Sequence, residues 1–242
     1  MKIGFSTDVG LKREINQDSL YVSEQQLYPI VAVADGMGGH KAGEVASQMF
    51  VETIKKYEQI LLENPEENIP KILRDLFEEA NREIYAKSQY EEECRGMGTT
   101  ATVAIIDEPT MYIAHVGDSR LYIYECGQLK QLTKDHSVVG EMLRSGEISA
   151  KEAINHPQKN IITKAVGTSE TLLAEFSEIE IDTIIVGFLC SDGLTNMLTN
   201  DEIEEVILDK IDNLNEASRE LVKRANENGG TDNITVILIK FD

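Results

Sequence analysis

The chain has 242 residues, and 43 Asp and Glu against 23 Lys and Arg give it a formal net charge of -20 at pH 7. The length predicts one globular domain over residues 1–242. The charge disfavours nucleic acids and membrane surfaces as partners, because both attract clusters of Lys and Arg. The longest apolar run, Ile184–Cys190, is far too short to span a membrane, and the first residues lack the apolar segment of a signal peptide. Because the three cysteines form no CxxC pair, we expect reduced thiols in a cytoplasmic protein, without a disulfide framework or a zinc ribbon.

Hydrophobic periodicity predicts groups of strands with helices between them. Two helices are expected from Val45 to Leu61 and from Ile69 to Ile84, because apolar residues recur there every three or four positions. Asn64-Pro65 separates these helices. Short apolar or alternating runs bounded by turn residues predict the strands. The predicted strands are Lys2–Asp8, Ser19–Ser23, Pro29–Asp35, Thr99–Ile106, Met111–Val116, Leu121–Glu125, Leu129–Leu132, Glu175–Ile181, Ile184–Ser191 and Asn233–Phe241.

Turn and capping signals indicate how these elements connect. Gly117-Asp118 and Gly127-Gln128 are typical of tight hairpin turns, which predicts antiparallel pairing of the strands around them. Thr199–Glu202 resembles a capping box that begins a helix. Gly229-Gly230 should end the last helix, which carries apolar residues from Leu214 to Ala225. Many antiparallel strands with helices grouped in pairs predict an α+β fold of two packed sheets flanked by helices.

Five aspartates stand where apolar strands meet turns. They are Asp18, Asp35, Asp118, Asp192 and Asp232. Each of them alone is explained by the preference of Asp for turns. If the sheets bring these strand ends together, however, the carboxylates would repel one another by several kcal/mol at an effective dielectric constant of about 20. Divalent cations would remove that repulsion, and ligands that are all oxygen favour magnesium or manganese. The glycine after Asp35 would let the backbone carbonyl of Gly36 approach an ion.

The sequence lacks the motifs of several other phosphoryl-transfer enzymes. Gly38 and Gly43 are followed by Glu44 instead of the lysine of a P-loop. No cysteine has an arginine six positions later, and no Asp is followed two positions later by another Asp, which excludes cysteine-dependent and DxD-type phosphatases. The segment GDSR has Arg120 where calcineurin-like metallophosphoesterases have histidine. A site made chiefly of aspartates remains.

Seven segments in order now identify a family. REINQDS, VAVADGMGGH, GMGTTATVAI, AHVGDSRLYIY, HPQKNIITKAVG, CSDGL and GGTDNITVILI span nearly the whole chain. Together they resemble the metal-dependent PPM (type 2C) protein serine/threonine phosphatases in their compact bacterial form. The resemblance implies a four-layer αββα sandwich, in which two mainly antiparallel sheets lie between two pairs of helices. It also implies a centre of two divalent cations, Mn²⁺ or Mg²⁺, at one end of the sandwich.

The resemblance assigns most of the aspartates to that centre. Asp35 would bridge the two ions, and Gly36 would contribute its carbonyl oxygen. Asp192 and Asp232 would complete the ligands of one ion, and Asp18 would hold metal-bound waters. A water shared by two cations loses a proton readily, which provides a nucleophile for hydrolysis without a covalent enzyme intermediate.

Three further assignments follow from the same resemblance. Asp118, together with Asp192, matches a third and weaker metal position of bacterial members. Arg13 matches the arginine that grips the substrate phosphate, and its planar guanidinium can engage two phosphate oxygens at once. The polar segment Thr133–Gly167, with a short helical pattern around Val138–Leu143, matches a flap beside the site. Such flaps gate access to substrate, although a plain surface excursion would have the same composition.

The chain departs from the family pattern at two positions. Many members have glutamate where this chain has Gln17, a neutral side chain that adds no charge at the metal centre, so we do not include Gln17 among the ligands. Animal and plant members have a histidine where this chain has Met37, which leaves the general acid unassigned. His40 lies close in sequence, but a single histidine at a helix start is more often a capping or packing residue.

Two functions from different classes remain open at this point. The first is hydrolysis of phosphoserine and phosphothreonine in proteins by a monomer that opposes a bacterial Ser/Thr kinase. The second is a catalytically silent module that binds metals or phosphoproteins, and the retention of Asp18, Asp35, Asp192 and Asp232 argues against it. A related class that acts on anti-sigma-factor antagonists fits less well, because this chain keeps the arginine motif and the flap.

Overall fold

The computed structural model describes residues 1–39, 42–64, 68–154 and 156–241, which form two antiparallel β-sheets and their flanking helices. The strands are β1 (Lys2–Asp8), β2 (Asp18–Val22), β3 (Ile30–Met37), β4 (Gly98–Thr99), β5 (Ala101–Asp107), β6 (Thr110–Val116), β7 (Arg120–Glu125), β8 (Gln128–Gln131), β9 (Glu175–Glu180), β10 (Ile184–Cys190) and β11 (Ile234–Lys240). One sheet has the order β1-β11-β10-β7-β8, and the other has the order β2-β3-β5-β6-β9 with β4 paired to β3.

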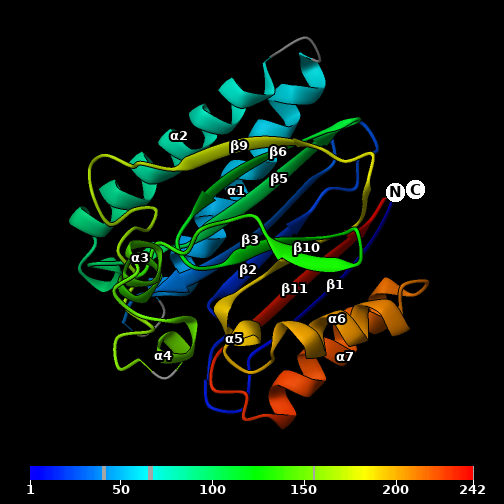
Figure 1. Cartoon of the computed structure of the whole chain (residues 1–242). Coiled ribbons are helices and arrows are strands. Elements are labelled where there is room, and N and C mark those ends of the chain that lie inside the picture. Colours follow the sequence, from blue (N-terminus) through cyan, green and yellow to red (C-terminus); the bar gives the residue numbers. More distant parts are fainter. Residues whose placement is uncertain (40–41, 65–67, 155, 242) are drawn as a thin grey trace.

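Helices cover the outer face of each sheet, and others lie at one end of the sandwich. They are α1 (Ala42–Glu63), α2 (Ile69–Tyr90), α3 (Val138–Ser145), α4 (Ala150–Ile154), α5 (Asp192–Thr195), α6 (Asn200–Asp209) and α7 (Leu214–Glu227), with a single 3₁₀ turn at Glu92–Cys94. In Figure 1, α1 and α2 lie on one side of the sandwich and α6 and α7 on the other, whereas α3 and α4 lie at one end. The four-layer αββα arrangement expected from the sequence is therefore confirmed.

Three apolar clusters fill the spaces between the four layers. One lies between α1, α2 and their sheet and contains the edge-to-face pair Phe50 and Phe77. The second lies between the two sheets, and the third lies under α6 and α7. Strand β3 is buried on both faces, because its even residues from Ile30 to Ala34 join the first cluster while Val31 and Val33 join the second. This explains why its sequence is an unbroken apolar run.

Most of the local signals act as expected. Thr199 and Glu202 form the capping box that begins α6, and α7 ends at Glu227, just before Gly229-Gly230. The β7–β8 hairpin is also present, but its two turn residues are Cys126-Gly127, one position earlier than expected, with φ values of 52° and 79°. Positive φ at both positions is the requirement of a type I′ turn. Among the described residues, no helix has both the length and the apolar character needed to cross a membrane.

Two expectations about strands were wrong. Gly117-Asp118 does not close a hairpin, because β6 pairs with β5 and β9 whereas β7 pairs with β10 and β8 in the other sheet. The turn instead carries the chain from one sheet to the other. The single strand expected over Thr99–Ile106 is interrupted at Thr100, whose hydroxyl accepts the hydrogen bond of the Asp35 N–H at 2.9 Å in place of a backbone carbonyl.

Candidate metal centre

The five aspartates all lie at one end of the sandwich. Asp18 begins β2 and is the register partner of Asp35 in β3. In the other sheet, Cys190 at the end of β10 pairs with Arg120 at the start of β7, so the strand ends next to Asp118 and Asp192 also coincide. Asp232 precedes β11, whose first residues lie beside the end of β10. The antiparallel register therefore gathers strand ends that are far apart in the sequence.

A buried hydrogen bond joins the two sheets within this group. Ser191, which follows β10, donates its hydroxyl to Asp18 Oδ2 in β2 at 2.7 Å. The same hydroxyl accepts from the Thr235 N–H of β11 at 3.0 Å. Ser191 is fully buried, so its position is fixed. Asp18, at the start of β2 in one sheet, is thus anchored to β10 and β11 of the other sheet.

The carboxylates of Asp18 and Asp35 are buried close to like charges. Burial, followed by the charges of the other four aspartates, raises the pKa of Asp35 well above its ordinary value. Burial also raises the pKa of Asp18 to about 7, although its hydrogen bonds from Thr235 and Ser191 act in the opposite direction. Without a counter-charge, burial and repulsion favour the protonated form of both carboxyl groups. These carboxyl groups stay ionised only when a positive charge lies close to them.

Asp118 and Asp192 are in a similar position. Burial and the charge of Asp192 raise the pKa of Asp118 well above its ordinary value. Burial and the charge of Asp232 raise the pKa of Asp192 to about 6. Arg120, held by Asp135 through hydrogen bonds of 2.7 to 3.1 Å, partly offsets both negative charges. One arginine that is already paired with a carboxylate cannot neutralise the group.

Three carboxylate oxygens of this group are buried without a hydrogen-bond partner among the described residues. They are Asp18 Oδ1, Asp118 Oδ1 and Asp192 Oδ1. Their second oxygens are not all free, since Asp192 Oδ2 accepts from Asn196 Nδ2 at 2.9 Å. An unpartnered buried carboxylate oxygen is costly and calls for a cation. Because every donor here is a carboxylate oxygen, the set suits a hard divalent ion such as Mg²⁺ or Mn²⁺ and not zinc.

Arg13 and Asp232 form an ion pair at the edge of this group. Arg13 Nη2 donates to Asp232 Oδ2 at 2.8 Å, and the arginine side chain is 47% exposed. Asp232 Oδ1 accepts from the Asn233 N–H at 2.9 Å. Both oxygens of Asp232 are therefore engaged. Among the described residues, no group of three or more His, Cys, Asp or Glu side chains is already arranged to hold one ion.

The backbone at Gly36 leaves no room for a side chain. A Cβ atom at this position would lie 2.0 Å from the carbonyl oxygen of Gly43 in α1. The Gly36 N–H donates to the Gln17 carbonyl at 3.1 Å. The start of α1 and the residue before Asp18 are thus packed directly against the chain next to Asp35. This contact is the physical reason for a glycine after that aspartate.

Asn233 fixes the loop that carries Arg13, and sequence analysis missed it. Its side-chain amide donates to the carbonyls of Val9 and Ile15 at 2.9 and 3.0 Å, and its Oδ1 accepts from the Gln17 N–H at 2.8 Å. The buried Asn233 thereby holds both ends of the loop. The position of an asparagine directly after Asp232 is a weak sequence signal for this role.

The candidates for a general acid differ in their surroundings. Met37 ends β3 and has no proton to donate. His40 lies outside the described residues. His115 is buried between Thr102 Oγ1 and the Lys134 carbonyl, at 2.9 and 3.1 Å from its two ring nitrogens. The structure brings no described histidine together with the aspartates as a proton donor.

The segment Thr133–Gly167 leaves the sandwich at this same end. It contains α3, which matches the helical pattern expected around Val138–Leu143, and also α4, which sequence analysis missed. Ser137 caps α3 by accepting from the Gly140 N–H at 3.1 Å. The segment returns to the sheet through the bridge between Val166 and Thr99.

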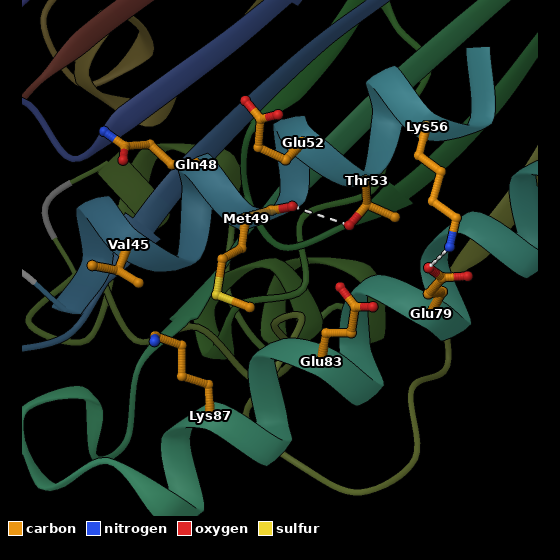
Figure 2. Close-up of a pocket in the computed structure, with 9 residues that line it drawn as sticks. All are labelled: Val45, Gln48, Met49, Glu52, Thr53, Lys56, Glu79, Glu83 and Lys87. Atoms are coloured by element: carbon orange, nitrogen blue, oxygen red, sulfur yellow. Dashed lines mark hydrogen bonds and ion pairs between the residues drawn. The ribbon is translucent and has the colours of Figure 1, made fainter. Parts of the chain in front are cut away.

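A groove of about 530 Å³ lies elsewhere, between α1 and α2. Figure 2 shows Lys56 of α1 paired with Glu79 of α2 at one end and Lys87 at the other, with Met49 between them. None of the five aspartates lines this groove. Its lining mixes three Glu with two Lys side chains, so most of its negative charge is compensated, unlike that of the aspartate group.

Known proteins resemble the whole chain. The sequence profile of the family described as "Protein phosphatase 2C" matches residues 12–238. The chain is 43% identical to the serine/threonine phosphatase stp of Listeria monocytogenes, with coverage of 100% of this chain and 96% of that protein. It is 39% identical to the protein phosphatase PhpP of Streptococcus pneumoniae, with coverage of 100% and 98%.

Solved structures agree with these sequence matches. The serine/threonine phosphatase Stp1 from Staphylococcus aureus superposes with a TM-score of 0.89 at 34% identity, with coverage of 100% of this chain and 95% of that chain. The catalytic domain of the serine/threonine protein phosphatase PstP, solved in complex with two manganese ions, superposes with a TM-score of 0.85 at 31% identity, with coverage of 98% and 96%.

Proposed function

The chain belongs to the protein phosphatase 2C family and is a metal-dependent protein phosphatase, and from that premise we propose that its five clustered aspartates hold the metal ions with which it hydrolyses phosphoserine and phosphothreonine. The observation that carries this proposal is the set of buried carboxylate oxygens on Asp18, Asp118 and Asp192 that have no partner among the described residues. A protein gains nothing in stability from such a group, so its value is in binding cations.

Asp35, the carbonyl of Gly36, Asp192 and Asp232 would hold the two main ions. Asp18 would hold water molecules on the ions. When bound, the two divalent cations supply a water of lowered pKa and neutralise the carboxylates. A third, weaker position would use Asp118 and Asp192. The physiological choice between Mn²⁺ and Mg²⁺ is part of the proposal, and we expect both to support activity.

Arg13 is the proposed ligand of the substrate phosphate. Its guanidinium is half exposed, and it already holds a carboxylate oxygen of Asp232 at 2.8 Å. If Asp232 held a cation instead, the Arg13 guanidinium would be free of this ion pair. A planar guanidinium can then bind two phosphate oxygens with the same geometry that it offers a carboxylate. Arg13 thus positions the ester, and the buried aspartates keep their charge for the ions.

The wider setting is proposed on similar grounds. Residues 1–242 would act as one domain and as a monomer, with Thr133–Gly167 as a flap beside the site. Phosphorylated proteins, including a bacterial Ser/Thr kinase and its targets, would be the partners. The three cysteines, Cys94, Cys126 and Cys190, are all free, which supports a reducing compartment such as the cytoplasm.

The proposal is tested by phosphate release from a phosphothreonine peptide and from a phosphotyrosine peptide of the same sequence. Purified protein is assayed with Mn²⁺, with Mg²⁺ and with EDTA. We expect release from phosphothreonine with either metal and none with EDTA, and much slower release from phosphotyrosine. Equal release with and without EDTA would refute a metal centre at the aspartates.

A further inference from the structure

The turn that carries Asp118 is held by a histidine from the start of the segment Thr133–Gly167. His136 Nδ1 accepts a hydrogen bond from the Gly117 N–H at 3.1 Å. The backbone N–H of His136 donates in turn to the Gly117 carbonyl at 2.7 Å. His136 is 1% exposed. Both polar backbone groups of the residue before Asp118 are therefore bound to one buried residue.

The orientation of the His136 ring is fixed from several sides. Because Gly117 donates to Nδ1, this nitrogen carries no proton, and the neutral ring has its proton on Nε2. Nε2 lies 3.2 Å from Glu175 Oε1 at the start of β9. The ring also stacks on His115, with centroids 5.1 Å apart and an angle of 24° between the planes. Burial lowers the pKa of His136, which agrees with a neutral ring.

Contacts with Thr100 also restrict the backbone on both sides of Asp118. Gly117 has a φ of 108°, and a Cβ atom there would lie 2.6 Å from Thr100. On the other side of Asp118, the Ser119 hydroxyl lies 2.8 Å from Thr100 Oγ1, the same oxygen that accepts from the Asp35 N–H. Asp118 is thus placed by two anchors. One leads to β3 and Asp35, and the other is His136.

We propose that His136 is a positioning residue for the metal position at Asp118. By holding Gly117, it aims the buried and unpartnered Asp118 Oδ1 into the aspartate group. This inference rests on the proposed function of Asp118. It also links the segment to the metal centre, because the neighbours of His136 anchor that segment: Asp135 grips Arg120, and Ser137 caps α3. A shift at the start of the segment would be passed to Asp118.

Two substitutions separate the hydrogen bond at Nδ1 from the contact of Nε2 with Glu175. The amide oxygen of Asn can take the place of Nδ1 and accept from Gly117, whereas the amide of Gln reaches the place of Nε2 and the contact with Glu175. We expect His136→Gln to weaken the weakest Mn²⁺ site, measured by calorimetry, by about 10- to 100-fold, as for other groups that orient metal ligands. His136→Asn should restore most of the affinity. The half-activating Mn²⁺ concentration should change in parallel.

A double-mutant cycle with Asp118→Asn distinguishes positioning from a general structural role. Asp118→Asn should remove the weak Mn²⁺ site, and adding His136→Gln to it should then have no further effect on Mn²⁺ binding or on the Mn²⁺ requirement. Equal losses caused by His136→Gln in both backgrounds would overturn the inference. So would an effect of Asp118→Asn with none of His136→Gln. If Asp118→Asn itself leaves Mn²⁺ binding unchanged, the proposed role of Asp118 is wrong and the inference falls with it.

Melting temperatures of all variants, measured in EDTA, serve as the folding control. If His136→Gln does not fold, Glu175→Ala provides the second variant, because Glu175 is half exposed and its loss only frees the ring. We expect a smaller loss of Mn²⁺ affinity in the same direction, again absent in the Asp118→Asn background. Unchanged Mn²⁺ affinity in Glu175→Ala, or an equal loss in the Asp118→Asn background, would overturn the inference.

Discussion

Asp18 and Asp35 are direct partners across the β2–β3 ladder, so two carboxylates stand opposite each other at one end of the sheet. Like charges at such positions destabilise a sheet. The chain keeps this pair although an asparagine at either position would relieve the repulsion. The pair is therefore a cost in the metal-free protein, and cations bound there would turn it into a source of stability.

Replacement of Asp35 should reverse the order of stability with and without metal. In EDTA, Asp35→Asn should raise the free energy of unfolding by about 1–3 kcal/mol, because the amide requires neither a buried charge nor the proton uptake that would neutralise it. In saturating Mn²⁺, the wild type should be the more stable protein, because an ion bound only by the folded state stabilises it. Thermal unfolding of both proteins in both buffers measures this. A variant that is less stable in both buffers would contradict it.

Replacement of Arg13 should affect substrate binding most. Arg13→Ala should raise KM for a phosphothreonine peptide by about tenfold or more with a smaller change in kcat, because it removes a contact made by the ground-state phosphate. Steady-state kinetics measure this. Arg219→Ala changes another exposed arginine, on the outer helix α7, and should leave both constants near the wild-type values. An unchanged KM in Arg13→Ala would remove the assigned role.

His115 predicts a pH dependence of stability. Burial, followed by the electrostatic effect of the neighbouring His136, lowers the pKa of His115 from 6.5 to about 4. The unfolded state then binds a proton at a higher pH than the folded state does. This contribution to stability is complete above pH 6.5 and is lost as the pH falls toward 4. Between pH 7.5 and 5 the loss should be about 2 kcal/mol.

The matched variant for this effect is His115→Gln, which cannot titrate and keeps an amide near the Lys134 carbonyl. Denaturant unfolding in EDTA at pH 7.5 and 5 gives the free energies of unfolding. The wild type should lose about 2 kcal/mol more than the variant over this interval, because other titrating groups affect both proteins alike. Equal losses would mean that His115 titrates normally in the folded state.

Much of the fold and the site could be predicted from local sequence patterns. The uninterrupted apolar run before Asp35 identified β3, and the change from apolar run to Asp marked the strand ends that meet in the centre. Capping signals such as Thr199–Glu202 located helix ends correctly. These features depend on residues close together in the sequence, so periodicity and turn chemistry carry them.

The remainder depends on contacts between distant residues. Gly117 and Asp118 are typical residues of a hairpin turn, but the pairing of β7 with β10 decides which sheet β7 joins. Ser191 reaches Asp18 across 173 positions, and Asn233 reaches Gln17 across 216. A serine and an asparagine in such places look like ordinary turn residues, because nothing local reveals their partners. His136 was missed for the same reason.

If Asp35 and its neighbours form the catalytic metal centre, turnover requires the Asp35 carboxylate. The most direct measurement is Mn²⁺-dependent phosphate release from a phosphothreonine peptide by wild type, Asp35→Asn and Asp201→Asn, in which the last replaces an exposed aspartate of α6. Circular dichroism checks that all three proteins are folded. We predict that phosphate release falls about 100-fold or more in Asp35→Asn alone, because a group essential to metal-assisted hydrolysis is removed. Wild-type turnover by a folded Asp35→Asn protein would mean that the catalytic metal centre lies elsewhere.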